Sequence, residues 1–237
     1  MIGFMGLNGK YSAGILLTFV LLGIVMLYVF PVISLITGSK TITGNAFSLS
    51  RIALWIILLI IFLYSLYIEK GCFLLITEKK YSIAFNIKAV ICLYLICVFG
   101  GAILNGLIQF LLHKEESNKI LQFSSLFKND YFLIIFTCFT AGAVEELLMR
   151  GYIQPRIEKI YNSPFIGVFV SAVLFGILHS TYGTIGQVVV PFFIGVVFAM
   201  FYKKYSNIKI LIVCHFMIDF VTLMAMNFID FKHLSVF

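Results

Sequence analysis

Long apolar runs constrain this chain more than any other feature of its sequence. Seven segments are rich in Leu, Ile, Val and Phe and hold few charged residues. They cover residues 15–37, 52–68, 89–112, 131–152, 164–182, 185–202 and 208–228. An α-helix of about 20 apolar residues crosses the hydrocarbon core of a bilayer. The pattern predicts an all-α, polytopic transmembrane helix bundle with about seven spans.

The composition excludes a water-soluble fold for the chain as a whole. The 237 residues are 62% hydrophobic and only 11% charged, whereas soluble domains have about 45–50% apolar and about 25% charged residues. No soluble domain and no internal repeat is visible, so we expect one integral membrane domain over residues 1–237. The run at 15–37 is long for a signal peptide and lacks a clear cleavage site, so we interpret it as the first span.

The basic residues predict the orientation of the bundle. The formal net charge is +7, but its Lys and Arg lie in short loops and form no basic face, so we expect lipid head groups and no nucleic acid as partners. With seven spans, 11 of the 17 basic residues fall on the side of the N-terminus. These are Lys10, Lys70, Lys79, Lys80, Lys88, Arg150, Arg156, Lys159, Lys203, Lys204 and Lys209. The other six are Lys40, Arg51, Lys114, Lys119, Lys128 and Lys232. The positive-inside rule then places the N-terminus in the cytoplasm, and we expect a bacterial plasma membrane.

A few ionisable residues interrupt the apolar segments, and they come from only three of them. The fourth segment holds Glu145, Glu146 and Arg150, the fifth holds His179, and the last holds His215 and Asp219. A charge at bilayer depth costs at least about 2.5–3.5 kcal/mol, so such residues face the bundle interior and usually have a function. We therefore expect a catalytic site between spans four, five and seven.

Helical spacing separates the roles of the two glutamates. Glu146 and Arg150 are four residues apart, with the acid first, which favours an ion pair on one face of a helix. Glu145 points about 100° away from Glu146 and has no partner nearby in the sequence. A buried carboxylate without an ion-pair partner is suited to general acid–base chemistry. Pro155 follows this segment and predicts that its helix ends there.

The two histidines also have residues at helical spacing. His215 and Asp219 are four residues apart, so we expect Asp219 to fix the tautomer of the imidazole. Phe175 and His179 have the same spacing, which allows the two rings to pack together. The distance along the helices raises a difficulty, because Glu145 and His215 lie roughly 10 Å from the cytoplasmic side and His179 lies roughly 22 Å from it. One common site therefore requires the helices to tilt or shift.

Together these residues spell EExxxR at Glu145–Arg150, FxxxH at Phe175–His179 and HxxxD at His215–Asp219. Their order on successive apolar segments resembles the CPBP family, which comprises CAAX proteases and bacteriocin-processing enzymes and is also called Abi. The resemblance covers residues 131–228, the motif-bearing core. It implies an intramembrane endopeptidase that hydrolyses a peptide bond in a lipidated protein or in a peptide pheromone or bacteriocin precursor.

The same resemblance implies a role for each residue. Glu145 would activate the hydrolytic water with help from His179, and Glu146 with Arg150 would hold the helix in place. His215 and Asp219 would stabilise the oxyanion. Members of the family often have Asn where this chain has Asp219, and an ionised Asp cannot donate a hydrogen bond to an oxyanion. Asp219 therefore either orients His215 or carries a proton itself.

A metal site is the alternative chemistry. The pair His179 and His215, together with a Glu, would suit zinc with an open position for water, although the chain has no HExxH motif. The five cysteines form no CxxC pair and predict neither a disulfide framework nor a zinc site. The sequence therefore identifies no cofactor with certainty. A divalent metal such as zinc is the second interpretation.

Two other functions compete with the protease hypothesis. A non-proteolytic membrane regulator or bacteriocin-immunity protein could use the same fold to bind a partner. A proton-coupled transporter could use Glu and His side chains as a relay, but no inverted repeat is visible. The three motifs in order favour the protease.

Overall fold

The computed structural model describes residues 6–38, 42–112, 125–180 and 183–228, and every regular element in these ranges is a helix. In chain order the helices are α1 (Leu7–Thr37), α2 (Gly44–Tyr67), α3 (Ile83–Leu112), α5 (Tyr131–Thr140), η2 (Ala141–Glu145), η3 (Leu147–Ile153), α6 (Gln154–Tyr161), α7 (Pro164–Leu178), α8 (Gly186–Tyr205) and α9 (Ile208–Phe228). The elements α5, η2, η3 and α6 form one continuous helix, Tyr131–Tyr161, which we call the central helix.

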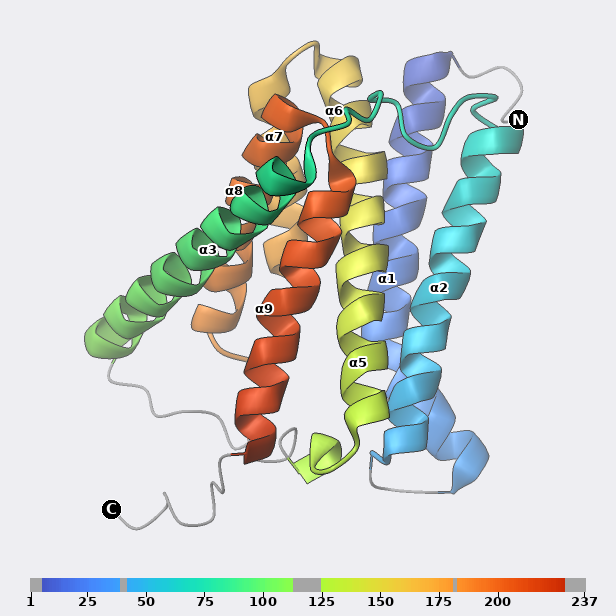
Figure 1. Cartoon of the computed structure of the whole chain (residues 1–237). Coiled ribbons are helices and arrows are strands. Elements are labelled where there is room, and N and C mark those ends of the chain that lie inside the picture. The colour runs from blue at the N-terminus through green and yellow to red at the C-terminus, as the bar shows by residue number, and fades with distance from the viewer. Residues whose placement is uncertain (1–5, 39–41, 113–124, 181–182, 229–237) are drawn as a thin grey trace.

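The helices form the all-α bundle that the sequence predicts. Six helices are long and apolar enough to cross a membrane, namely α1, α2, α3, the central helix, α8 and α9. They run up and down between the two ends of the bundle (Figure 1). The seventh apolar helix, α7, has 15 residues, or a length of about 22 Å, which is short of the roughly 30 Å of a hydrocarbon core. The prediction of a full span over 164–182 was therefore too long, since the helix ends at Leu178; residues 181–182 lie outside the described ranges.

The predicted end of the fourth span was wrong, because the helix continues past Pro155 to Tyr161. Proline interrupts an α-helix because it lacks an N–H and crowds the preceding turn. Here Pro155 is the second residue of α6 and lies two residues after the end of η3, whose turns are wider than those of an α-helix. A wide turn leaves room for the pyrrolidine ring, so the helix accommodates Pro155 and continues beyond it.

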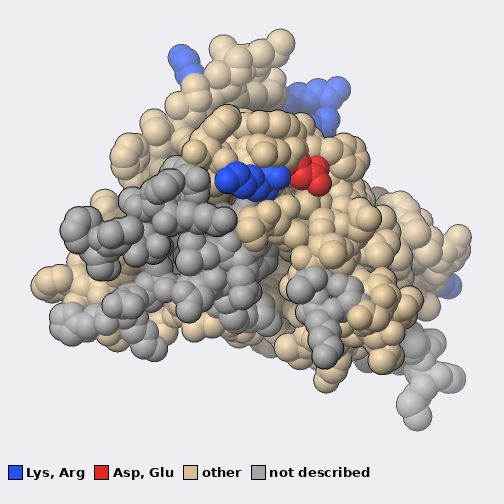
Figure 2. All heavy atoms as spheres, turned by 90° about the horizontal axis from the view of Figure 1, so that it is seen from below, with Lys and Arg blue, Asp and Glu red and all other residues tan. Residues whose placement is uncertain are grey.

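Charge is distributed unevenly between the two ends of the bundle. The end that carries the start of α1 and of α9 holds most of the described basic residues: Lys10, Lys70, Lys79, Lys80, Arg156, Lys159, Lys203, Lys204 and Lys209. Charged side chains are sparse among the described atoms of the opposite end (Figure 2). Lys40, Lys114, Lys119 and Lys232, which the sequence assigns to that end, lie outside the described residues.

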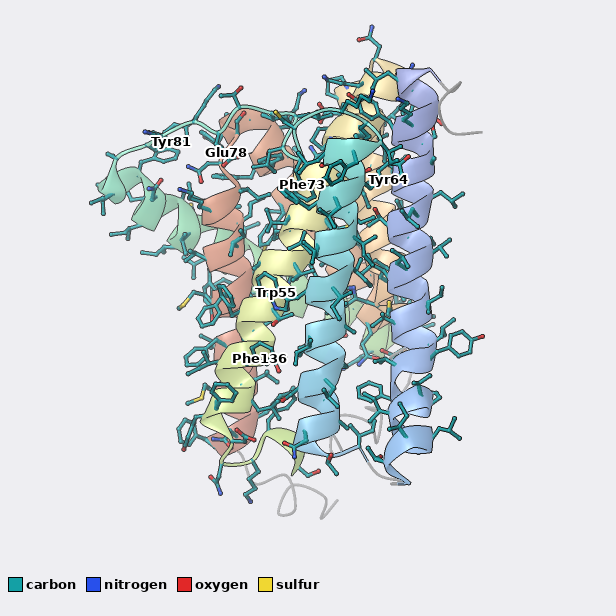
Figure 3. The ribbon with its side chains drawn as sticks, turned by 90° about the vertical axis from the view of Figure 1, so that its right-hand side faces the viewer. Trp55, Tyr64, Phe73, Glu78, Tyr81 and Phe136 are labelled. Atoms are coloured by element: carbon teal, nitrogen blue, oxygen red, sulfur yellow. The ribbon has the colours of Figure 1, made fainter. Side chains whose placement is uncertain are left out.

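An irregular segment over residues 68–82, here called the strap, crosses the basic end between α2 and α3 (Figures 1 and 3). Glu69 lies near its start and receives hydrogen bonds from Arg156 and, at 2.7 Å, from the Tyr152 hydroxyl. Glu78 lies further along and accepts a 2.7 Å bond from the backbone N–H of Ile208, at the first turn of α9. The strap thus ties α2, the central helix and α9 together.

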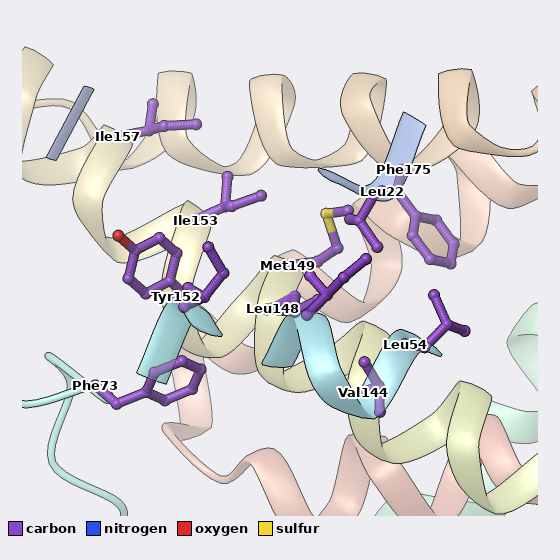
Figure 4. Close-up of a cluster of buried hydrophobic side chains, with 12 residues drawn as sticks. Leu22, Leu54, Phe73, Val144, Leu148, Met149, Tyr152, Ile153, Ile157 and Phe175 are labelled. Atoms are coloured by element: carbon purple, nitrogen blue, oxygen red, sulfur yellow. The ribbon is translucent and has the colours of Figure 1, made fainter. Parts of the chain in front are cut away.

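The central helix passes through the middle of the bundle. In its most apolar stretch 67% of the residues are buried, against at most 28% in the other five long helices. Its side chains Val144, Leu148, Met149, Tyr152 and Ile153 pack with Leu22, Leu54, Phe73, Phe175 and their neighbours in one cluster (Figure 4). Because lipid tails are as apolar as these side chains, close packing rather than water exclusion stabilises such a helix.

Candidate active site

Two wide helical turns flank Glu146 at the centre of the bundle. The turns η2 and η3 have π-helical hydrogen bonding and lie immediately before and after it. Such turns are rare and occur frequently at functional sites, because they change the direction of the side chains that they carry. Sequence periodicity did not predict them.

Glu146 and Arg150 form the ion pair that their spacing predicts. The Arg150 Nη1 atom lies 2.9 Å from Glu146 Oε1, and both side chains are fully buried. Arg150 also donates a 3.2 Å bond from Nη2 to the carbonyl oxygen of Gly195 in α8. Its guanidinium carbon lies 4.6 Å from the ring centre of Phe175 and 5.7 Å from that of Phe198. Aromatic faces attract a desolvated cation, so protein groups compensate the charge of Arg150, while its buried Nε has no hydrogen-bond partner among the described groups.

His215 lies between two carboxylates, the expected Asp219 at one ring nitrogen and Glu146, which was not expected there, at the other. Its Nδ1 donates a 2.8 Å hydrogen bond to Glu146 Oε1. Asp219 Oδ2 lies 3.6 Å from the other nitrogen, Nε2, which is beyond a normal hydrogen bond. Glu146 thus joins two helices, since it accepts from Arg150 on its own helix and from His215 on α9. The Nε2 atom of His215 is left facing Asp219.

His179 lies at the C-terminal end of α7 and close to the same group. Its Nδ1 donates a 2.8 Å bond to the carbonyl oxygen of Phe175, so in the neutral ring Nε2 carries the lone pair. The ring of Phe175 lies 4.7 Å from the ring of His179 and 6.1 Å from that of His215. The ring of Phe175 therefore packs against both imidazoles.

The difference in depth disappears for two structural reasons. The central helix runs on to Tyr161, which places Glu145 about 24 Å from that end, and His179 lies about 22 Å from the start of α7 at Pro164. His215 reaches the same depth because α9 begins below the end of α6, as Figure 1 shows. A shift of α9 rather than a strong tilt of α7 brings the residues together.

Glu145 lies half-buried beside the ion pair, and no described hydrogen bond engages its side chain. It is close enough to Arg150, His215 and Asp219 to act on each of them electrostatically. Asp219 experiences His179 in the same way. The structure therefore gathers all six residues that the sequence singled out, with Glu146 and Arg150 fully buried and Glu145, His179 and Asp219 partly exposed.

The described residues do not match a metal site. Within these ranges no three His, Cys, Asp or Glu side chains are placed to share one ion. The Nε2 atom of His215 faces Asp219. The reaction proposed below therefore uses only the side chains of this chain.

Three neighbours of the site were not predicted. Gly195 supplies a backbone carbonyl, which no side-chain motif reveals, and Phe198 is one of 26 phenylalanines. Arg51, in α2, acts electrostatically on Asp219. Its signal in the sequence was an isolated charge ahead of an apolar run, which we had interpreted as an orientation charge only.

The comparisons with known proteins point to the same segment. Residues 127–221 match the sequence model of the Rce1-like family, described as type II CAAX prenyl endopeptidase Rce1-like. This range contains all six candidate residues. No curated protein and no solved structure matches the chain.

Proposed function

Because the chain belongs to the Rce1-like family of CAAX-type membrane endopeptidases, we propose that it hydrolyses a peptide bond of a membrane-associated substrate by a water that Glu145 activates. The substrate is a lipidated protein or the precursor of a peptide pheromone or bacteriocin. One observation supports this most directly: three helices bring Glu145, His179 and His215 to one depth around a buried ion pair.

In the proposed reaction Glu145 is the general base. Its carboxylate removes a proton from the water while the water oxygen bonds to the carbonyl carbon of the scissile peptide. The lone pair on Nε2 of His179 accepts the second hydrogen bond of that water and orients it. When the C–N bond breaks, Glu145 returns its proton to the amine that leaves, so one water is consumed and both products are balanced.

His215 and Asp219 stabilise the oxyanion together. Because Nδ1 of His215 donates to Glu146, only a proton on Nε2 can be offered to the oxyanion. Asp219, 3.6 Å away, favours the protonated imidazole and so keeps that donor in place. Asp219 therefore acts on the oxyanion through His215 and does not itself need to donate a hydrogen bond to it. Glu146 and Arg150 are positioning residues, since they touch the imidazole and the helix but not the substrate.

The test uses purified protein in detergent and an internally quenched peptide that ends in farnesyl-cysteine and three further residues. We expect Glu145→Gln to lower kcat by about 100-fold or more, because it removes the base while keeping the shape of the side chain. Glu158→Gln is the matched control. Glu158 lies on the same continuous helix, pairs with Lys203 at 2.6 Å and is remote from the site, so its loss should leave the rate unchanged.

A chelator arm tests the zinc interpretation. If EDTA leaves the wild-type rate unchanged, the side-chain mechanism is supported. If EDTA abolishes cleavage and zinc restores it, His179 and His215 would act as ligands and the mechanism above would be wrong. Normal cleavage by Glu145→Gln would refute the assignment of the base. A regulator that does not cleave peptides would show its cellular phenotype with Glu145→Gln as with wild type.

A further inference from the structure

Arg51 is the cation near the candidate site that the mechanism leaves unused. It is the eighth residue of α2, a helix long and apolar enough to span the membrane. An arginine inside such a helix is costly, so it normally faces the bundle interior or reaches the interface. The side chain of Arg51 is half-buried.

The contacts of Arg51 engage its Nε atom and one face of its guanidinium, and they leave its two Nη atoms available to a ligand. Nε donates a 3.2 Å hydrogen bond to the hydroxyl of Ser50, which is itself buried. The guanidinium carbon lies 4.6 Å from the ring centre of Phe47. Among residues 6–38, 42–112, 125–180 and 183–228, no carboxylate forms a salt bridge with Arg51, and its Nη atoms make no hydrogen bond. Arg150, in contrast, is occupied by Glu146, Gly195 and two aromatic rings.

The surroundings of Arg51 place it next to the site. Phe47, beneath its guanidinium, packs in one cluster with Cys138 of the central helix and with Phe216 and Phe220 of α9. Phe220 follows Asp219 directly in the chain, and Arg51 is among the charges that act on Asp219. Arg51 therefore lies near Asp219, where α2, the central helix and α9 pack together.

We propose that Arg51 is a specificity-determining residue that binds the free C-terminal carboxylate of the substrate peptide. The inference rests on the proposed function and adds a recognition element for one end of the substrate. A guanidinium matches a carboxylate with two parallel N–H···O bonds, and Ser50 and Phe47 fix its plane in advance. The carboxylate of a peptide end would otherwise enter the bundle without a counter-charge.

The geometry also limits the length of peptide on that side. Asp219 lies one helical turn from His215, a distance of about 6 Å along α9. An extended peptide covers about 3.3–3.6 Å per residue. A carboxylate held near Asp219 therefore leaves room for only a few residues after the scissile bond, so long C-terminal extensions should be poor substrates.

The experiment compares two quenched farnesylated peptides that differ only in a C-terminal carboxylate or carboxamide. For wild type we expect kcat/KM to be about 10- to 100-fold higher for the acid, as for a hydrogen-bonded charge, with the difference mainly in KM. Arg51→Gln should lose this preference by slowing the acid to the rate of the amide. Arg51→Lys should keep part of it. Lys128→Gln, at the same end of the bundle and exposed, should keep all of it.

The outcomes separate this inference from the proposed function. Equal cleavage of acid and amide by wild type would overturn the role of Arg51 while leaving the protease assignment intact. An equal loss for both peptides in Arg51→Gln would do the same and would point to a lipid head group or to folding. Absence of cleavage of either peptide by wild type would instead count against the proposed function.

Discussion

Arg150 has its charge neutralised by a carboxylate, a carbonyl oxygen and two aromatic faces, all supplied by the protein. Removing one partner of such a buried pair leaves the other charge without compensation, which is far more damaging than replacing both. The loss of Arg150 would destabilise Glu146 in particular, because the second oxygen of this buried carboxylate, Oε2, has no hydrogen bond among the described groups.

We therefore predict that Arg150→Met lowers the free energy of unfolding by about 3–5 kcal/mol. The double variant Glu146→Leu/Arg150→Met should be more stable than the single one, since neither charge of the Glu146–Arg150 pair is then buried without its partner. Denaturant titration in mixed micelles measures both. Lys203→Met, which breaks the partly exposed pair with Glu158, is the control and should cost about 1 kcal/mol or less. If the double variant had a lower free energy of unfolding than Arg150→Met, this explanation would be wrong.

The contact between the central helix and α9 depends on Gly142. A Cβ atom there would lie 2.8 Å from the carbonyl oxygen of Ile212 and 3.1 Å from the backbone nitrogen of Phe216. Both atoms belong to the backbone of α9, so the helix itself would have to move. His215 lies between these two positions on α9, and its hydrogen bond to Glu146 would lengthen.

We expect Gly142→Leu to reduce the cleavage rate by about 100-fold through this displacement, although Glu145 and the ion pair are unchanged. Gly23→Leu is the matched control, because a Cβ at Gly23 in α1 meets nothing within 4 Å. Peptide cleavage and the unfolding midpoint should be measured for both variants. Wild-type activity in Gly142→Leu would show that the close approach of α9 is not needed for the site.

The bundle as a whole has one basic, strapped end and one end with few charges. The strap residues Glu69 and Glu78 close the first end against the central helix and α9. At the other end Asp219 and Arg51 remain partly exposed. By the positive-inside rule we expect the strapped end to face the cytoplasm. The partly exposed side of the site would then face the opposite membrane surface.

Cys72 provides a direct test of this orientation, since it is an exposed cysteine in the strap. We predict that a membrane-impermeant maleimide labels it only after the cells are permeabilised. Cys72→Ser should remove the signal. A cysteine introduced at exposed Lys128 in that background should be labelled in intact cells. Labelling of Cys72 in intact cells would reverse the orientation.

Several features of the fold and site follow from local sequence. The apolar runs predict the helices because transfer into lipid depends on composition over about 20 residues. The Glu146–Arg150 pair is confirmed because residues four apart share a face of one helix. The three motifs identify the segments that meet, since charges inside a membrane face inward.

Other features depend on how the helices are rotated and shifted against each other, and no local pattern encodes that. Glu146 contacts His215 in addition to Asp219 because α9 begins deeper in the bundle than its neighbours. Arg156, counted from sequence as a loop charge, is buried against Glu69 because the strap folds back over the central helix. The helix passes Pro155 because a wide turn precedes it. Each of these three features depends on how segments far apart in the chain pack against one another, and this packing is decided only when the whole bundle assembles.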